Sequence, residues 1–489
     1  MTFTQRRVSL SELLAALPPG TQTQGDPDRE ISALTADSRA VTAGALFVAL
    51  RGERTDGHRF VGEAVRRGAA AVVMEEPQPL PAQATGIVVA DSARALSHLA
   101  DTFYGHPSGD LEVVGVTGTN GKTTTAQMVG AILNAAGIAA GTIGTIGARL
   151  GQRRWPLANT TPLAHDLHAL LAGMRELGAR AVAMEVSSHA LSLQRVADVH
   201  FAVGALTNVT RDHLDFHGTL ESYALAKRLL FERSLRCAVN VDDEFGARWA
   251  AEFRSRKPVR TYAIGSRDAD VRAEAIEVRA GGSTFRVGGT RFQLRMPGRF
   301  NVANALCAIA VARYFDVTNA TAGEGLLAME RVPGRMDCVR GSGVDVVIDY
   351  AHTPDSLERA LQALRETTPG RLILVFGCGG DRDRGKRPEM GAVAARLSDV
   401  AYVTSDNPRG EDPRAIAGEI VGGIGSAAHV VELDRRSAIE AAIEQARPGD
   451  AVLIAGKGHE NYQVVGSRVL PFDDLTVARE ALARRELQT

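Results

Sequence analysis

The segment GTNGKTTT, residues 118–125, combines glycines, a lysine and hydroxyl groups in an order suited to nucleotide phosphates. Glycines let backbone N–H groups approach phosphate oxygens, and the N-terminus of the helix that follows adds a favourable dipole. Lys122 would meet the β- and γ-phosphates of ATP, and the Thr123 hydroxyl would face Mg²⁺. The fit to GxxxxGK(S/T) is imperfect, because Val116 stands at the first glycine position. An ordinary strand-to-helix turn would not need this order of residues. The predicted ATP contacts of the loop are Gly118, Thr119, Asn120, Gly121, Lys122, Thr123 and Thr124.

Polar residues also cluster in the last third of the chain, after apolar stretches. Segments such as VDVVIDYA, LILVFGCGG and DAVLIAGKG alternate there with helical ones such as SLERALQALRE. This alternation predicts a parallel sheet with helices on both faces. In such sheets, ligands bind outside the carboxyl ends of the strands. We therefore predict a binding site from the four clusters at strand ends, residues 349–352, 379–382, 406–409 and 456–460.

The bulk properties are those of a globular chain in a reducing compartment. Its 489 residues correspond to about three domains. A formal net charge of -1 does not mark it as a binder of nucleic acid or membrane surfaces. The cysteines Cys237, Cys307, Cys338 and Cys378 form no CxxC pair, which argues against disulfides and structural zinc. The N-terminal segment MTFTQRRVSLSELLAALPPG predicts an amphipathic helix and not a signal peptide, and no apolar run could span a bilayer. We expect a cytoplasmic protein.

Two segments are predicted to separate domains. The first is YGHPSGD, residues 104–110, because a buried type of strand begins directly after it, and the second is RVPGRMD, residues 331–337. The proline-rich stretch at residues 75–86 is predicted to be a loop inside the first domain.

The chain resembles the Mur ligases of peptidoglycan synthesis over essentially its whole length. So many motifs in one order make the resemblance specific. The motifs are GTNGKTTT at 118–125, NTTP at 159–162, MEVSSH at 184–189, TNVTRDHLDFHG at 207–218, ESYALAK at 221–227, GRFNVANALCA at 298–308, DYAHTPDSL at 349–357, GCGGDRDRGKRP at 377–388, DNPR at 406–409 and GKGHE at 456–460.

The resemblance implies an α/β chain of three domains. These are an N-terminal UDP-sugar-binding α/β domain at residues 1–105, a central P-loop ATPase-like domain with a parallel sheet at 106–334, and a C-terminal Rossmann-like domain for the amino acid at 335–489. ATP would phosphorylate a substrate carboxylate, and an amine would then displace phosphate from the acyl phosphate. Because the first step brings two anions together, cations and dipoles must face the transferred group.

The motifs are most similar to those of family members that add meso-2,6-diaminopimelate to UDP-N-acetylmuramoyl-L-alanyl-D-glutamate (UDP-MurNAc-L-Ala-D-Glu). The resemblance therefore implies a role in cell wall biogenesis, cell shape and cell division. We expect a monomer that acts on these small molecules and binds neither nucleic acid nor membranes.

The resemblance also implies the magnesium ligands. Glu185 and His213 match two of them, and Thr123 would add its hydroxyl. Taken alone, the glutamate at a strand end could be solvated and the histidine could be a turn residue. Lys227 matches the family's carboxylated lysine, in which CO₂ converts a cation into an anion that can bind a second Mg²⁺; the alternative is a solvated helix lysine. Nearby Asp212, Asp215 and His217 are interpreted as scaffold.

For the UDP-MurNAc-dipeptide, the resemblance points to Ser38 at the uridine end and to a second group around the peptide. That group is Asn159, Thr160, Thr161, Ser187 and Arg195. The family commonly has glutamine two residues before this arginine, where this chain has Leu193 with Gln194 beside it, so the residue that makes this contact stays open. Asn301, Arg335 and Asp349 match the remaining ATP contacts, although Asn301 could instead cap a helix.

The segment DNPR, residues 406–409, is the family's signature for diaminopimelate. Arg409 could pair with its distal carboxylate through two parallel bonds, close to the helix start predicted at residues 411–413. Asp406 and Glu460 could receive ammonium groups, and Arg382 could hold the other carboxylate. The predicted amino-acid site is completed by Asn407, Pro408 and Gly456. Taken alone, DNPR would also suit a turn.

Three alternatives remain. An L-lysine-adding homologue would carry a different tetrapeptide in place of DNPR. Folylpolyglutamate synthetases share the core, but the DSR and LFVALRG segments at residues 37–39 and 46–52 argue against them. A P-loop switch protein would not need the strand-end clusters. Since ATP and amine must meet, we also expect the last domain to rotate about residues 333–335.

Overall fold

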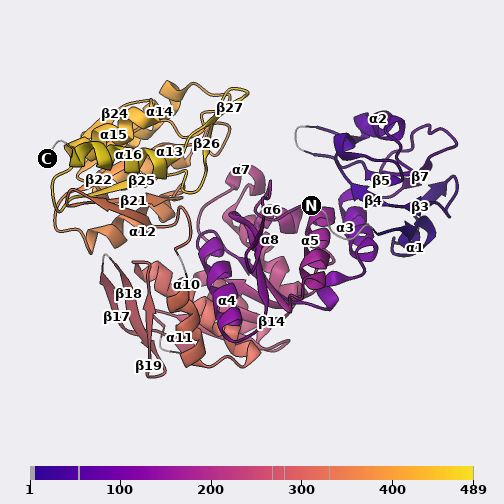
Figure 1. The fold of residues 1–489 in the computed structure, drawn as a ribbon, viewed down its shortest axis with the longest axis horizontal. Helices are drawn as coiled ribbons and strands as arrows, with labels where there is room; N and C mark the ends of the chain where they lie inside the picture. Colours follow the sequence, from indigo (N-terminus) through magenta and orange to yellow (C-terminus); the bar gives the residue numbers. More distant parts are fainter. Residues whose placement is uncertain (1–5, 53–54, 267, 280, 330, 488–489) are drawn as a thin grey trace. The chain divides into compact units, whose positions relative to one another are not determined.

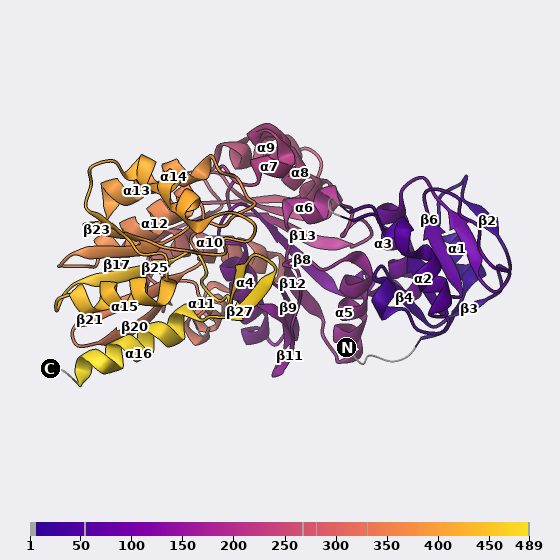
Figure 2. The ribbon, with the colours of Figure 1, turned by 90° about the horizontal axis from the view of Figure 1, so that it is seen from above.

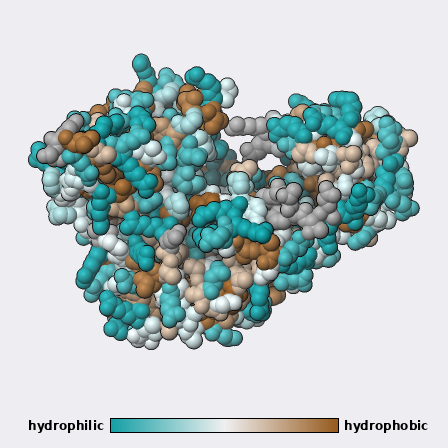
Figure 3. All heavy atoms as spheres, in the orientation of Figure 1, coloured by the Kyte–Doolittle hydropathy of each residue, from teal (hydrophilic) through white to brown (hydrophobic). Residues whose placement is uncertain are grey.

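The computed structural model describes residues 6–52, 55–266, 268–279, 281–329 and 331–487, which form an α/β chain (Figure 1). The chain divides into two compact units. The first comprises Met1–Thr117, Gly137–Ala205 and Ala226–Cys237, and the second comprises Gly118–Ala136, Leu206–Leu225 and Ala238–Thr489. The described part of the chain contains no helix long and apolar enough to cross a membrane. Hydrophobic residues lie scattered among hydrophilic ones on the face seen in Figure 3.

A five-stranded sheet opens the first unit. β1 and β3 lie beside it as a separate two-stranded sheet. The elements of this region are β1 (Val8–Ser9), α1 (Leu10–Ala15), β2 (Gln22–Gln24), β3 (Glu30–Ile31), β4 (Ala33–Thr35), β5 (Ala45–Val48), α2 (Val61–Arg66), β6 (Ala71–Met74), β7 (Thr85–Val88) and α3 (Ser92–Phe103). The order is β2-β7-β6-β5-β4, with only β2 antiparallel to its neighbour. The predicted N-terminal helix is confirmed as α1, where Ser9 caps the Glu12 N–H and Leu10 and Leu13 are buried.

A second sheet in the first unit contains the strand that leads into the phosphate loop. The strands are β8 (Glu112–Thr117), β9 (Ala140–Gly144), β10 (Gly147–Leu150), β11 (Arg153–Trp155), β12 (Ala181–Glu185) and β13 (Phe201–Leu206), with helices α5 (Ala164–Glu176) and α6 (Ser188–Ser192). Their order is β11-β10-β9-β12-β8-β13. β8 and β12 are parallel, with Glu185 opposite Val116. Both are almost wholly apolar, as expected for parallel strands covered on both faces.

The second unit begins with the helix that the phosphate loop opens. The elements are α4 (Lys122–Ala135), α7 (Leu214–His217), α8 (Leu220–Arg233), β14 (Ser234–Asn240), α9 (Glu244–Phe253), β15 (Val259–Ala263), β16 (Val271–Arg272), β17 (Glu274–Arg279), β18 (Gly282–Val287), β19 (Thr290–Leu294), α10 (Arg299–Ala312) and α11 (Asn319–Ala328). α8 and β14 each have one end in either unit. Helix α4 packs against α10 and α11, and β17 to β19 form a small antiparallel sheet.

The C-terminal sheet has the order β20-β21-β25-β22-β23-β24. Its elements are β20 (Asp337–Gly341), β21 (Val344–Asp349), α12 (Pro354–Arg365), β22 (Leu372–Phe376), α13 (Lys386–Leu397), β23 (Val400–Val403), α14 (Pro413–Ile424), β24 (His429–Val431), α15 (Arg435–Gln445), β25 (Ala451–Ala455), β26 (Tyr462–Val465), β27 (Arg468–Pro471) and α16 (Asp474–Glu486). The predicted parallel sheet is confirmed from β21 to β24, whereas β20 is an antiparallel edge strand.

Alternate residues of the C-terminal strands build two separate cores. Leu372, Leu374 and Phe376 pack with α12, α13 and α14, whereas Ile373 and Val375 pack with α15 and α16. The two groups of helices lie on opposite sides of the sheet (Figure 2). A sheet buried on both faces can present polar groups only at its strand ends, which is where the predicted clusters lie.

Candidate active site

The phosphate loop runs from the end of β8 to the start of α4, as predicted. Gly118 has φ 149° and a Cβ there would overlap the Thr207 hydroxyl. Gly121 is the N-cap of α4 with φ 85°, and a Cβ there would overlap the Asn304 amide. Both positions therefore require glycine, for their backbone angle and for their close neighbours.

The segment after β13 braces this loop. Thr119 N–H donates to the Asn208 carbonyl at 2.8 Å, and Asn120 N–H donates to Asn208 Oδ1 at 3.0 Å. The Thr119 hydroxyl accepts from Thr210 N–H at 2.9 Å and donates to the Thr210 carbonyl at 3.0 Å. Lys122 Nζ donates to the carbonyls of Gly118 and Thr119 at 2.9 and 2.8 Å. The first residues of the TNVTRDH motif thus hold the loop in shape.

A cavity adjoins the loop within the second unit. It brings together predicted ATP contacts from the loop and from later parts of the chain. They are Asn120, Gly121, Thr123, Thr124, Asn301, Arg335 and Asp349. It is also lined by Asn208 and Asn304, which sequence reasoning missed, and by Tyr350 and His352 of the predicted strand-end cluster 349–352. Asn304 stands three residues after Asn301 in α10, a spacing that puts both on one helix face.

Arg335 and Asp349 are fixed by specific contacts in this cavity. The Arg335 guanidinium lies 4.5 Å above the Tyr350 ring and donates to the Thr123 hydroxyl at 3.1 Å. Asp349 accepts from the N–H groups of Met336 and Ala351, each at 2.8 Å. Burial raises the pKa of Asp349, while the Arg335 charge and these hydrogen bonds act in the opposite direction.

Asn301 is not a helix cap. The N-cap of α10 is Gly298, and Asn301 is in the first turn. Its Nδ2 donates to the Pro297 carbonyl at 2.7 Å, and its Oδ1 accepts from Asn304 at 3.3 Å.

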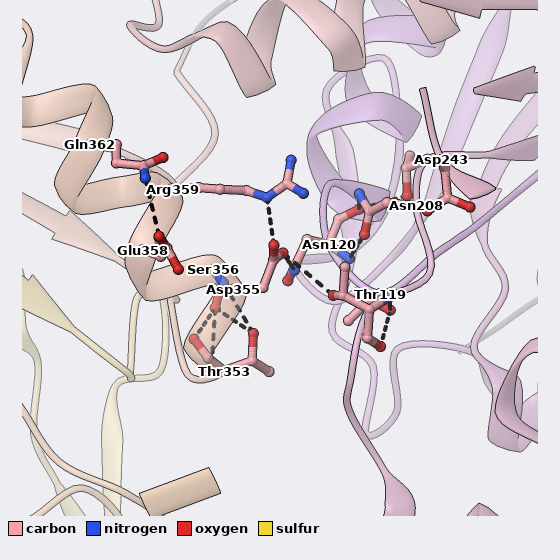
Figure 4. A network of polar contacts seen from close by, with 12 residues as sticks. Thr119, Asn120, Asn208, Asp243, Thr353, Asp355, Ser356, Glu358, Arg359 and Gln362 are labelled. Carbon is pink, nitrogen blue, oxygen red and sulfur yellow. Dashed lines mark hydrogen bonds and ion pairs between the residues drawn. The ribbon is translucent and has the colours of Figure 1, made fainter. Parts of the chain in front are cut away.

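Asp355 joins the phosphate loop to the first turn of α12 (Figure 4). Its Oδ2 accepts from Asn120 Nδ2 at 2.8 Å and from the Thr210 hydroxyl at 3.4 Å. Its Oδ1 accepts from Arg359 Nε at 2.9 Å. Thr353, the N-cap of α12, fixes this turn through a capping box with Ser356. A carboxylate that sequence reasoning left unassigned therefore orients a side chain of the loop.

Asp212 and His213 follow the loop-holding segment, residues 208–210, and directly precede α7. His213 is the N-cap residue of α7 with φ 52°, and its Nε2 is 3.4 Å from Asp212 Oδ2. Burial favours the neutral form of Asp212, but nearby positive charges outweigh it and lower its pKa to about 2. These charges belong to Lys386 and Lys122 and to the protonated forms of His213 and His352. Asp212 is thus held as an anion, and its interpretation as scaffold stays a prediction.

In the first unit, Glu185 ends β12 and is buried. Its carboxylate accepts from Thr145 N–H at 2.7 Å and from the Thr145 hydroxyl at 3.0 Å. Thr145 also contacts Thr160 at 3.1 Å. Lys227 belongs to the same unit and its side chain is only 1% exposed, so the solvated alternative is wrong. Thr123 and His213 belong to the second unit.

The NTTP segment meets the start of α6. The Thr161 hydroxyl donates to the Glu185 carbonyl at 2.9 Å and accepts from Ser187 N–H at 3.1 Å. Arg195 Nη1 donates to the Thr161 carbonyl at 3.1 Å. Three predicted substrate residues, Thr161, Ser187 and Arg195, are therefore connected through short contacts. Asn159 and Thr160 precede Thr161 in the same loop, and Ser38 lies in a separate 3-10 turn, Ser38–Ala40.

Gln194, not Leu193, makes polar contacts beside Arg195. Its Oε1 accepts from Arg94 at 3.5 Å and from Arg233 at 3.2 Å, and its backbone φ is 56°. Leu193 is 38% exposed.

Three of the four strand-end clusters meet at the carboxyl ends of β22, β23 and β25. Gly380 N–H donates to the Asn407 carbonyl and Arg409 Nη1 donates to the Gly380 carbonyl, each at 2.9 Å. Asn407 Nδ2 donates to Glu460 Oε2 at 2.8 Å. A Cβ on Gly456 would lie 2.5 Å from the Asp406 carboxylate. Pro408 is buried between Asn407 and Arg409, whereas Arg382 is exposed.

Arg409 is held by a hairpin that sequence reasoning missed. Its φ is 50°, its N–H donates to the Val464 carbonyl at 3.0 Å, and its carbonyl accepts from Gly466 N–H at 2.7 Å. Val464 and Gly466 belong to the hairpin of β26 and β27. Arg409 itself is half-buried.

Comparison of the sequence with known proteins shows to which family the chain is related. The profile of the Mur ligase family catalytic domain matches residues 30–104, that of the Mur ligase middle domain matches 116–312, and that of the Mur ligase glutamate ligase domain matches 334–458. A UDP-N-acetylmuramoyl-L-alanyl-D-glutamate--2,6-diaminopimelate ligase from Syntrophomonas wolfei is 44% identical over 97% of this chain and 99% of its own. A relative of the same name from Thermosynechococcus vestitus is 45% identical over 98% of each chain. The chain belongs to the Mur ligase family.

Solved Mur ligases share the fold. A structure of a UDP-N-acetylmuramoyl-L-alanyl-D-glutamate--2,6-diaminopimelate ligase, 31% identical, aligns over 98% of this chain and 99% of its own with TM-score 0.68. MurF from Acinetobacter baumannii, 22% identical, aligns over 99% and 100% with TM-score 0.70. The predictions of an α/β Mur ligase with N-terminal, central and C-terminal domains, and of an enzyme of the ligase class, are confirmed. The boundaries at 105 and 334 stay predictions.

Among the residues that the structure describes, no group of three or more His, Cys, Asp or Glu side chains is arranged to hold a metal ion. The magnesium ligands predicted for this Mur ligase include a threonine and a modified lysine, which are outside that set. Both the buried Glu185 carboxylate and a carboxylated Lys227 would offer oxygen donors, which Mg²⁺ prefers. The donor chemistry therefore fits magnesium.

Proposed function

We propose that this Mur ligase uses ATP to join meso-diaminopimelate to the D-glutamate of UDP-MurNAc-L-Ala-D-Glu. The observation that carries the proposal is the identity of 44–45% over nearly the whole chain with relatives that bear this activity in their names. The cluster of Asp406, Arg409 and Glu460 supports it, because it offers both charges to an amino acid with ammonium and carboxylate groups. We further propose that the enzyme works as a cytoplasmic monomer on small molecules alone.

The cavity beside the phosphate loop is the proposed ATP site. The loop N–H groups and Lys122 would receive the phosphates, which requires Lys122 to leave its two carbonyl partners. Arg335 and Asp349 would contact the nucleoside part, and Asn301 would line the same space. The remaining loop contacts are those predicted from the sequence, at residues 118–124. We propose Thr123, Glu185, His213 and carboxylated Lys227 as the ligands of Mg²⁺, which would neutralise phosphate charge when bound.

The first step forms a mixed anhydride. A carboxylate oxygen of the UDP-linked substrate attacks the γ-phosphorus, and ADP leaves. Arg195, Ser187 and Thr161 would hold this substrate, together with Asn159 and Thr160, and Ser38 would contact its uridine end. The contacts that already connect Thr161, Ser187 and Arg195 support a preorganised peptide site.

The second step forms the amide. The neutral amine nitrogen of diaminopimelate attacks the acyl carbon, the tetrahedral intermediate expels phosphate, and the nitrogen loses a proton. Arg409 would bind the distal carboxylate, with Arg382 at the other carboxylate. Asp406 and Glu460 would receive ammonium groups, and Asn407, Pro408 and Gly456 would shape the site. L-Lysine lacks the distal carboxylate, so Arg409 would have no partner in the lysine complex.

Mass spectrometry of a reaction tests the proposal. The purified chain is incubated with ATP, Mg²⁺, UDP-MurNAc-L-Ala-D-Glu and either meso-diaminopimelate or L-lysine. We expect one equivalent of ADP and a UDP-linked tripeptide that contains diaminopimelate. A lysine product of equal yield would assign the lysine-adding activity instead. ADP release with folate and glutamate, but not with the UDP substrate, would assign a folylpolyglutamate synthetase.

A further inference from the structure

Lys457 follows Gly456 after β25, and its side chain is fully buried, with 0% exposure. It belongs to the GKGHE motif, but sequence reasoning gave it no role. Burying an ammonium group is costly unless it is hydrogen-bonded and paired with an anion. Lys457 has two such partners, Asn407 and Glu460, which offset the cost of its burial.

Both partners belong to the proposed amino-acid site. Lys457 Nζ donates to Asn407 Oδ1 and to Glu460 Oε2, each at 3.2 Å. It also lies 5.5 Å from the centre of the Tyr462 ring, near enough for a cation–π contribution. Lys457 thus connects the loop after β23 with the loop after β25.

These contacts decide which way the Asn407 amide faces. Its Oδ1 accepts from Lys457 Nζ at 3.2 Å and from Val464 N–H at 2.9 Å, so the opposite orientation would set an NH₂ group against two donors. The Asn407 NH₂ group is consequently directed to Glu460 Oε2, at 2.8 Å. Glu460 Oε2 receives both Asn407 and Lys457, which leaves its carboxylate in one position.

We infer that Lys457 is a positioning residue for the amine substrate. It fixes the Asn407 amide and the Glu460 carboxylate in the orientation that receives an ammonium group, and being buried it does not touch the substrate. The inference rests on the proposed function, because that function assigns Asn407 and Glu460 to the amino-acid site. A bound substrate then meets groups that are already oriented, which lowers the entropy cost of binding.

The test replaces Lys457 by methionine, which has similar length but neither charge nor donor. We expect Lys457→Met to raise the KM for the amine ten- to a hundredfold and to leave the KM for ATP within twofold. The matched control is Arg371→Met. Arg371 pairs with Asp450 at 2.8 Å, just before the amino ends of β22 and β25. Arg371→Met removes an ion pair beside the same two strands, so this substitution should lower the melting temperature without changing the KM for the amine.

A mutant cycle separates positioning from a general effect on packing. In an Asn407→Ala, Glu460→Ala background, adding Lys457→Met should cause no further fall in kcat/KM for the amine, because the groups that Lys457 positions are gone and its buried ammonium has lost both partners. A further loss as large as in the wild-type background would overturn the inference, and so would equal rises in the KM values for amine and ATP. If Lys457→Met does not fold, Lys457→Gln takes its place in the same cycle, with a smaller expected rise because one donor is kept.

The kinetics use whichever amine the wild type accepts. Rejection of diaminopimelate by the wild type would overturn the proposed function. The dependence of Asn407 and Glu460 on Lys457 would still be decided by the cycle.

Discussion

Arg409→Ala should remove most of the preference for diaminopimelate over lysine. The guanidinium has five N–H donors, and one of its groups, Nη1, already donates to the Gly380 carbonyl at 2.9 Å. The other donors can still form two parallel bonds to a carboxylate. The Arg409 main chain is held by Val464 and Gly466, and those bonds do not depend on the side chain. The substitution therefore removes the cation and leaves the loop in place.

The size of the effect follows from the two bonds. Hydrogen bonds to charged groups contribute ~1.5–3 kcal/mol each, and half-burial of Arg409 favours the lower end. Two bonds then give ~3 kcal/mol, which corresponds to about 100-fold in the ratio of kcat/KM values for diaminopimelate and lysine. Arg409→Lys keeps the charge but not the fork, so the ratio should fall about tenfold.

The assay is coupled ADP release with each amine varied at saturating ATP and UDP-MurNAc-L-Ala-D-Glu. In Arg409→Ala, kcat/KM for diaminopimelate should fall while the small value for lysine hardly changes. Arg382→Ala is the control for the ratio, because Arg382 is proposed at the carboxylate that both amines carry, so kcat/KM should fall for both amines and their ratio should not change. An unchanged ratio in Arg409→Ala would refute the reasoning. A large fall of this ratio in Arg382→Ala alone would identify Arg382 as the discriminating cation.

Three further perturbations test other parts of the molecule. Lys227→Ala should nearly abolish turnover, and added short carboxylic acids should partly restore it; full activity in the variant would exclude the carboxylated lysine. Asp355→Ala frees the Asn120 side chain, which must then be ordered when ATP binds, so calorimetry should show ATP affinity weakened about two- to tenfold. Glu358→Ala on the same helix should leave ATP affinity unchanged. Equal affinities in the two variants would show that the Asp355–Asn120 contact does not contribute to ATP binding. Burial lowers the pKa of His168 to about 4 from an ordinary 6.5. The unfolded chain therefore takes up a proton first, and the free energy of unfolding should fall by up to ~3 kcal/mol from pH 6.5 to pH 4; denaturant titrations of His168→Leu should lose this slope, and an unchanged slope would assign it to other groups.

The parts of the site that were predictable are those whose chemistry is local in sequence. The phosphate loop was found because glycines, lysine and hydroxyls must be consecutive to surround a phosphate. The strand-end clusters were found because a sheet covered on both faces has no other place for polar groups. Asp349 and Arg409 stand at such ends, and the structure joins Arg409 to the neighbouring cluster.

The parts that were not predictable depend on contacts between distant segments. Nothing in the sequence around Asp355 shows that its carboxylate meets Asn120, 235 residues away. Lys457 could be read as a phosphate-binding or solvated lysine, because a motif does not tell whether a side chain points inward. The hairpin of β26 and β27 acts on Arg409 through main-chain bonds, which leave no mark on residue type.

That hairpin bears on any attempt to exchange amino-acid selectivity between relatives by grafting. The four letters DNPR encode side chains, but the left-handed backbone of Arg409 is imposed by Val464 and Gly466, more than fifty residues downstream. A tetrapeptide transferred alone would lack the main-chain hydrogen bonds that hold Arg409 in this conformation. The smallest portable unit of selectivity is the pair of segments, residues 406–409 with residues 456–471, moved together.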